Sequence, residues 1–129
     1  MLYKEDIVRI LREMNLPLSE YWITSGAALV MHGVKETTRD IDLGCTTSLV
    51  EQYIDKGCKY KAANDNTRIV EVSDEIEVLE NWFVDKVEVI DGLPVGSLES
   101  IKKQKLELGR EKDINDIKLI DEYINKKLI

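Results

Sequence analysis

The chain has 129 residues, of which 43% are hydrophobic and 33% charged, a balance typical of an ordinary soluble globular protein and not of a disordered one. This length predicts a single domain, residues 1–129, with a substantial core. The formal net charge is −7, from 18 basic and 25 acidic residues, which argues against a general DNA-binding or RNA-binding surface. A small anionic substrate would therefore need local cations or a metal ion to hold it.

The sequence contains no apolar run that approaches membrane-spanning length, and residues 1–6 do not resemble a signal peptide. Cys45 and Cys58 lack the spacing of a CxxC motif. Two such cysteines fit free thiols near the core of a reduced protein better than a disulfide scaffold. We therefore expect a cytoplasmic protein that does not bind membranes.

The first third of the chain predicts a helix, a strand and a second short helix. Apolar residues recur at helical spacing over 4–15, and Pro17 follows as a helix breaker. Residues 21–24 are typical of a short buried strand. Ser25 and Gly26 then turn the chain into a short helix over 27–32, which Gly33 closes.

The middle of the chain alternates strand and turn patterns. Residues 41–45 predict a strand, and the hydroxyls of 46–48 can cap a helix that runs to about residue 56. Turns are expected at 64–66 and 73–75. The remaining predicted strands are 60–62, 68–72, 76–82 and 87–90.

The C-terminal part predicts helices from about residue 97 to 128. Residues 92–96 are predicted as a loop, and Ser97 is an expected N-cap. The last helix has an apolar stripe of Ile114, Ile117, Ile120, Ile124 and Leu128. Together the elements predict an α+β fold, an α/β sandwich in which helices flank a mixed β-sheet.

Two aspartates that flank one apolar residue suggest a metal site. Asp40 and Asp42 are separated by Ile41 at the start of the predicted strand, so the two carboxylates share one face. Side-by-side carboxylates repel each other unless a cation lies between them. Hard divalent cations, which also bind phosphates, prefer such oxygen ligands. A chance DxD pair on solvated surface is the alternative in a chain with 25 acidic residues.

A third carboxylate is expected from a neighbouring strand, either as a metal ligand or as a general base. The acidic stretch 74–80 offers Glu77 as the first choice and Glu75 as the second, both on the face opposite Ile76. The alternative is that the acidic residues of this region mark the wet face of a half-exposed strand.

The small residues at Ser25 and Gly26 could let a phosphate approach the backbone closely. These residues belong to a larger pattern that resembles the nucleotidyltransferase superfamily, which includes DNA polymerase beta. The pattern consists of segments 25–29, 32–33, 38–43 and 105–116. It is most similar to the small bacterial members, namely minimal nucleotidyltransferases, aminoglycoside-type or lincosamide-type enzymes, and toxin–antitoxin nucleotidyltransferases.

The resemblance implies roles for individual residues. In that family a GG or GS turn starts a helix and cradles the triphosphate, a DxD pair binds magnesium, and a later strand supplies a third acidic residue. Ser25 and Gly26 would hold the triphosphate, and Asp40, Asp42 and Glu77 would hold Mg²⁺, with Mn²⁺ as the alternative ion. The chain departs from the family pattern in having Ser25 for the first glycine and a glutamate as third carboxylate.

Basic residues near the C-terminus are the expected phosphate partners. Lys105 and Lys112 belong to a set at helical intervals, and residues 110–113 match an R-x-K-D pattern that packs beside the nucleotide site in the resembling family. Lys105 and Lys112 are therefore expected to bind the triphosphate. The alternative is that both lysines form i,i+4 pairs on a solvated helix.

Three further residues are interpreted as structural. His32, the only histidine, is expected at a helix C-terminus and not as a base. Trp22 and Trp82 are expected to be core and sheet residues instead of base-stacking platforms.

The sequence thus favours a Mg²⁺-dependent nucleotidyltransferase that moves a nucleoside monophosphate from a nucleoside triphosphate such as ATP to a hydroxyl acceptor. The acceptor would be a small molecule, a protein or RNA. The alternative is a catalytically silent protein of the same fold that acts as a binding partner, such as an antitoxin-like subunit. A homodimer or a partner protein would supply a separate acceptor-binding domain, for which the chain shows no obvious candidate. The weakest hypothesis is an acidic metal-binding or structural domain.

Overall fold

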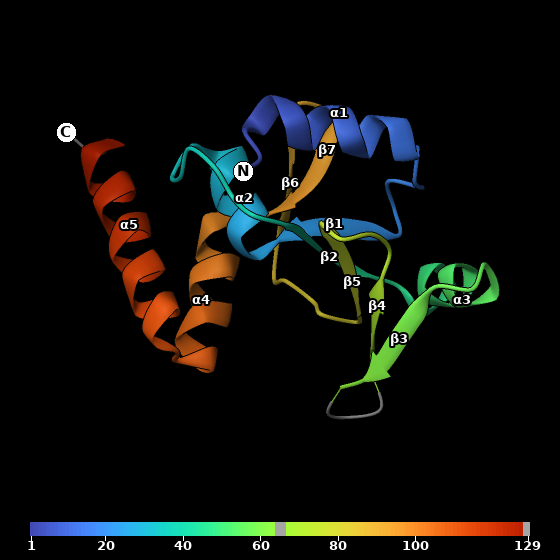
Figure 1. The fold of residues 1–129 in the computed structure, drawn as a ribbon. Helices are drawn as coiled ribbons and strands as arrows, with labels where there is room; N and C mark the ends of the chain where they lie inside the picture. The colour runs from blue at the N-terminus through green and yellow to red at the C-terminus, as the bar shows by residue number, and fades with distance from the viewer. Residues whose placement is uncertain (64–66, 128–129) are drawn as a thin grey trace.

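The computed structural model describes residues 1–63 and 67–127 (Figure 1). The predicted turn at 64–66 and Leu128 lie outside the described residues. The described parts of the chain form five helices and seven strands, in the order α1 (Lys4–Met14), β1 (Tyr21–Thr24), α2 (Ser25–His32), β2 (Ile41–Cys45), α3 (Thr47–Asp55), β3 (Lys59–Ala62), β4 (Arg68–Glu71), β5 (Ile76–Glu80), β6 (Val87–Ile90), β7 (Leu93–Gly96), α4 (Leu98–Leu108) and α5 (Glu111–Lys127).

All seven described strands form one mixed sheet in the order β3-β4-β5-β2-β1-β7-β6. The central strand β2 pairs antiparallel with β1 and parallel with β5. Figure 1 shows α4 and α5 side by side near one end of the sheet, whereas α3 packs against β4 and β5 toward the other end. The α+β fold expected from the sequence is confirmed.

One face of the sheet forms the hydrophobic core. Ile23, Leu43 and Val78 are register partners on β1, β2 and β5, and all three are fully buried. Helix α2 contacts β1, β2 and β7, whereas α3 contacts β4 and β5. Because strand side chains alternate between faces, the residues next to this row point to the opposite face of the sheet.

Local signals explain most of the elements. Helix α1 begins where the Tyr3 backbone N–H donates to Asp6 Oδ2 at 2.9 Å, and it buries Ile7 and Leu11. Helix α3 is capped by Thr46, whose Oγ1 accepts from the Leu49 N–H. Such caps stabilise helix ends by about 1 kcal/mol each. The predicted Ser97 cap of α4 is also confirmed, because its Oγ accepts from the Ser100 N–H.

The predicted loop at 92–96 is wrong, because Leu93–Gly96 is the buried strand β7. Asp91 and Gly92 both have positive φ, 52° and 79°, as a tight hairpin requires. This turn folds β7 back onto β6, and β7 also runs parallel to β1. Pro94 and Gly96 gave the segment a loop-like composition although it is buried.

Several predicted boundaries shift. Helix α2 begins at Ser25, two residues earlier than predicted, and β3 begins at Lys59. Strand β4 ends at Glu71. Strand β5 ends at Glu80 because Asn81 takes a left-handed φ of 55°, which turns the next residues out of the sheet. No helix in the described ranges has the length and apolar character needed to cross a membrane.

The predicted helical face that joins Lys105 to Lys112 is wrong. Gly109 has a φ of 61° and ends α4, so the two lysines lie on different helices. The apolar stripe predicted for the last helix is also only partly correct. Ile120 is buried, but Ile114 is 50% exposed, and α5 buries the carboxylates of Asp113 and Asp116.

Candidate functional site

Asp42 and Glu77 lie next to each other on the sheet face opposite the core. They are register partners on the parallel strands β2 and β5. Thr24 pairs with Asp42 from β1, and Glu71 pairs with Glu77 from β4, so one row of polar side chains crosses four strands. Asp40 immediately precedes β2 and is exposed. The sheet therefore brings together Asp40, Asp42 and Glu77, three predicted site residues that come from two separate segments of the chain.

The carboxylate of Asp42 is electrostatically strained. Burial, followed by the negative charges of Asp40 and Glu77, raises the pKa of Asp42 from 3.8 to about 6. The charges of Lys112 and Lys105 act in the opposite direction. An acidic group held among other acidic groups gains from a bound cation, because the cation relieves both the repulsion and the loss of hydration.

The chemistry of these side chains fits Mg²⁺, whereas their positions do not form a complete ligand set. Carboxylate oxygens are the protein ligands that Mg²⁺ uses, usually one or two of them together with waters and phosphate oxygens. Asp40 and Asp42 meet this need. Within residues 1–63 and 67–127, no three or more His, Cys, Asp or Glu side chains are gathered to hold a metal ion. The role of Glu77 as a ligand therefore stays a prediction.

Ser25 and Gly26 form a tight turn at the start of α2. Ser25 has a φ of 57°, a left-handed conformation that glycine adopts more easily than serine. Gly26 lies close to Thr38, because a Cβ added to it would be 3.0 Å from Thr38 Oγ1. Thr24 is the N-cap, and its side chain does not cap the helix. The N-terminal amides of α2 thus lie one residue beyond Thr24, the register partner of Asp42.

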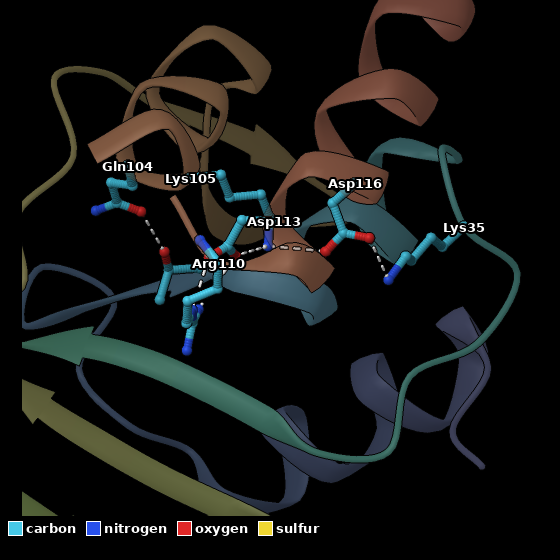
Figure 2. A network of polar contacts seen from close by, with 7 residues as sticks. Lys35, Gln104, Lys105, Arg110, Asp113 and Asp116 are labelled. Carbon is cyan, nitrogen blue, oxygen red and sulfur yellow. Dashed lines mark hydrogen bonds and ion pairs between the residues drawn. The ribbon is translucent and has the colours of Figure 1, made fainter. Parts of the chain in front are cut away.

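A network of ion pairs joins α4, α5 and the segment before β2 (Figure 2). The Lys105 ammonium is buried and lies 2.9 Å from Asp116 Oδ2 and 3.6 Å from Asp113 Oδ1. Lys35 reaches the other oxygen of Asp116 at 2.7 Å. Lys105 therefore pairs across two helices instead of within one solvated helix. Its predicted contact with a triphosphate is not tested, and its charge already has two carboxylate partners.

Arg110, the first residue of the R-x-K-D pattern, is a cation whose charge interacts with Asp42. Its Nε and Nη2 donate to the fully buried carboxylate of Asp113 at 2.6 and 3.1 Å. This pairing raises the pKa of Arg110 and lowers that of Asp113, and the charge of Asp42 also contributes to the shift of Arg110. Arg110 is thus fixed near Asp42 while its side chain remains 47% exposed.

Lys112 is the other cation near the carboxylates. It is exposed at the start of α5, and its positive charge partly offsets the rise in the pKa of Asp42. In the part of the chain that the structure describes, Lys112 forms no ion pair, unlike Lys105. Lys112 and Arg110 consequently have surface available for an anionic ligand, and the role of Lys112 stays a prediction.

The structural roles predicted for three residues are largely confirmed. His32 is the last residue of α2, and its Nε2 lies 2.8 Å from the Gly96 carbonyl oxygen. Trp22 is buried in β1. The core and sheet position predicted for Trp82 is wrong, because Trp82 lies beyond the end of β5 and is 37% exposed. The two cysteines are free, as predicted.

No protein-family model matches the sequence, and no curated protein matches it. Two solved structures do share its architecture. ANT(2″)-Ia in complex with adenylyl-2″-tobramycin has 20% sequence identity and a TM-score of 0.57, with 92% of this chain and 85% of that chain covered. A candidate nucleotidyltransferase from Thermotoga maritima has 17% identity and a TM-score of 0.60, with 97% of this chain and 96% of that chain covered.

The chain has the nucleotidyltransferase fold. The resemblance seen in the sequence is thereby confirmed at the level of the fold. At identities of 17% and 20%, the likeness carries no information on substrate or acceptor. Any assignment of activity on the nucleotidyltransferase fold has to come from the side chains on the sheet face opposite the core.

Proposed function

We propose that the protein is a Mg²⁺-dependent nucleotidyltransferase that transfers a nucleoside monophosphate from a nucleoside triphosphate to a hydroxyl acceptor and releases pyrophosphate. The observation that carries the proposal is the register of β2 and β5. It holds Asp42 beside Glu77, close enough to Asp40 for mutual repulsion, on the sheet face opposite the core. Such an acidic cluster next to a helix N-terminus and two exposed cations suits a metal-bound triphosphate.

Asp40 and Asp42 would hold the metal ion. A bound Mg²⁺ would supply the positive charge that offsets the negative charge of the triphosphate during transfer. Glu77, the register partner of Asp42, would either complete the ligand set or accept the proton of the acceptor hydroxyl. Glu75, the second choice, precedes β5, and its backbone carbonyl accepts from the Ile41 N–H. The register therefore favours Glu77.

The phosphates would lie between the start of α2 and the start of α5. The amides that follow Thr24 supply donors for phosphate oxygens, and the positive end of the helix dipole favours an anion there. Arg110 and Lys112 supply positive charge from α5 and the residue before it. Lys105 and Lys35 act indirectly, because their pairs with Asp116 fix α5 against α4 and the segment before β2.

The direct test is transfer of label from α-phosphate-labelled ATP, GTP, CTP and UTP in the presence of Mg²⁺. Small-molecule, RNA and protein fractions are supplied as acceptors. We expect one fraction to become labelled by the wild-type protein. Labelling should fall at least 100-fold in Glu77→Gln and only slightly in Glu75→Gln, a matched loss of one charge from the same acidic segment. Equal loss in both variants would exclude Glu77 as the third carboxylate.

A catalytically silent binding partner is the second candidate, and one observation favours it. Ser25 occupies a left-handed position at which the resembling family usually has glycine, so the phosphate-binding turn is less favourable here. Under this hypothesis, no nucleotide labels any acceptor, and the protein co-purifies with a partner such as a toxin. Transfer of label by the isolated chain would exclude it.

A further inference from the structure

A second row of side chains lies directly beside the acidic row, on the same face of the sheet. Trp22, Gly44 and Leu79 are register partners on β1, β2 and β5. Each is two residues from its counterpart Thr24, Asp42 or Glu77, and side chains two residues apart in a strand point to the same face. The spacing between the rows is about 7 Å. The first row is polar, whereas the second is apolar.

Gly44 leaves room for the indole of Trp22. A Cβ on Gly44 would lie 2.0 Å from Trp22 Nε1 and 2.6 Å from the Trp82 carbonyl oxygen, so no other residue fits without displacement. Trp22 Nε1 donates to that carbonyl oxygen at 2.7 Å. The indole is therefore fixed across β2, one row away from Asp42.

Phe83 stacks on the fixed indole. The ring centroids of Trp22 and Phe83 are 5.6 Å apart, and the ring planes differ by 19°. Phe83 is nevertheless 68% exposed, which leaves most of its ring surface open beyond the Trp22 contact. An exposed ring on an ordered support presents a flat apolar surface to solvent.

Hydrogen bonds through Gln104 connect the backbone of Phe83 to Thr24, a member of the polar row that contains Asp42. Gln104 of α4 donates from Nε2 to the Phe83 carbonyl oxygen at 2.8 Å, and its Oε1 accepts from Thr24 Oγ1 at 2.9 Å. Thr24 is the register partner of Asp42. Gln104 consequently links the Phe83 backbone to the β1 neighbour of a predicted metal-binding carboxylate. Leu79 and Trp82 also line a cavity of about 430 Å³, so the nearby surface is hollowed.

We infer that Phe83, supported by Trp22, is the surface on which the nucleobase of the nucleotide stacks. This inference rests on the proposed function. In a nucleoside triphosphate the ribose separates the base from the α-phosphate, so a phosphate near Asp42 places the base several ångströms away. The indole of Trp22 lies in the row next to Asp42, and the exposed ring of Phe83 stacks on this indole. Stacking accepts every base, which predicts weak discrimination among nucleotides by Phe83 itself.

The test compares Phe83→Ala, Phe83→Leu and Phe83→Trp with the wild-type chain by isothermal titration in Mg²⁺. The ligands are a non-hydrolysable ATP analogue and inorganic tripolyphosphate, which lacks a base. Tyr60→Ala is the matched control, because Tyr60 is an aromatic residue 54% exposed and is in register with the core-facing Val70. Circular dichroism confirms that each variant folds.

We expect Phe83→Ala and Phe83→Leu to weaken binding of the ATP analogue roughly 5-fold to 100-fold. Phe83→Trp and Tyr60→Ala should bind like the wild type, and tripolyphosphate should bind all chains equally. Wild-type affinity of Phe83→Ala for the analogue, or an equal loss for tripolyphosphate, would overturn the inference and leave the proposed function intact. Failure of the wild-type chain to bind any nucleotide would overturn both.

Discussion

Asp42 and Glu77 are side by side in the register of two parallel strands, and the resulting repulsion helps to raise the pKa of Asp42 to about 6. Burial makes the larger contribution to this shift. The fold therefore maintains an unfavourable charge in a central strand. Residues held at a cost to stability are typical of functional sites, where a ligand relieves the cost.

The first prediction concerns the effect of the Asp42 carboxylate on the free energy of unfolding. Because the pKa of Asp42 is about 6 in the folded chain and its ordinary value is 3.8, the folded state binds more protons than the unfolded state between these values. The free energy of unfolding should thus fall as pH rises from about 4 to about 6. Asp42→Asn should be more stable than the wild type at pH 8 by up to about 3 kcal/mol.

Urea unfolding at pH 3.5 and pH 8 without metal measures this difference. The stabilisation should be present at pH 8 and absent at pH 3.5, where the wild-type carboxyl is protonated. Asp74→Asn, an exposed aspartate in the turn before β5, is the control and should change stability little at either pH. A less stable Asp42→Asn variant at pH 8 would contradict the electrostatic account.

The second prediction concerns Ser25. A left-handed φ costs a non-glycine residue about 1 to 2 kcal/mol, and glycine loses part of that gain through its larger unfolded-state entropy. Ser25→Gly should therefore raise the free energy of unfolding by roughly 0.5 to 1 kcal/mol. Ser25→Ala retains the backbone cost and removes only the hydroxyl.

Thermal unfolding of the two Ser25 variants separates the effect of the backbone conformation on stability from the effect of the hydroxyl group. We expect a higher Tm for Ser25→Gly and no increase for Ser25→Ala. If both variants lose stability equally, the hydroxyl matters more than the φ of 57°, and the strain argument fails.

The third prediction concerns the ion pairs at the N-terminal end of α5. Lys105→Met removes the buried ammonium between Asp113 and Asp116, which leaves two buried carboxylates with one cation each. Loss of one member of a buried ion pair destabilises by about 3 kcal/mol or more. Lys103→Met is the matched control on the same helix, because Lys103 is 60% exposed in its pair with Asp85.

Chemical denaturation should show a large loss of stability for Lys105→Met and a nearly unchanged value for Lys103→Met. Similar behaviour of the two variants would mean that the Lys105 network does not fix α5. The nucleotide affinity of Lys105→Met should also fall, because Arg110 and Lys112 lose their fixed position.

The sequence was sufficient to predict local features of the fold and the candidate residues of the site. Helical spacing identified α1, and the hydroxyl caps at Thr46 and Ser97 identified the starts of two helices. The DxD pair and the small-residue turn indicated the nucleotidyltransferase fold, which the structure confirms. These signals are local, because each depends on a few consecutive residues.

Other features depend on contacts between distant segments. The choice of Glu77 was made from strand alternation, but its place beside Asp42 follows from the sheet order, which local patterns do not encode. Burial of Lys105 depends on the break at Gly109, after which α5 folds back on α4. Phe83 gave no sequence signal, because its position results from the turn at Asn81 and from Gln104 of a later helix.

Mg²⁺-dependent binding of a non-hydrolysable ATP analogue, measured by isothermal titration, tests the central claim most directly. The wild-type chain should bind the analogue only when Mg²⁺ is present. The double variant Asp40→Asn with Asp42→Asn should not bind it. The control variant Asp85→Asn with Asp91→Asn makes the same change in net charge at two exposed aspartates and should bind normally. Wild-type binding by the Asp40 and Asp42 double variant would contradict the assignment of the metal and nucleotide site.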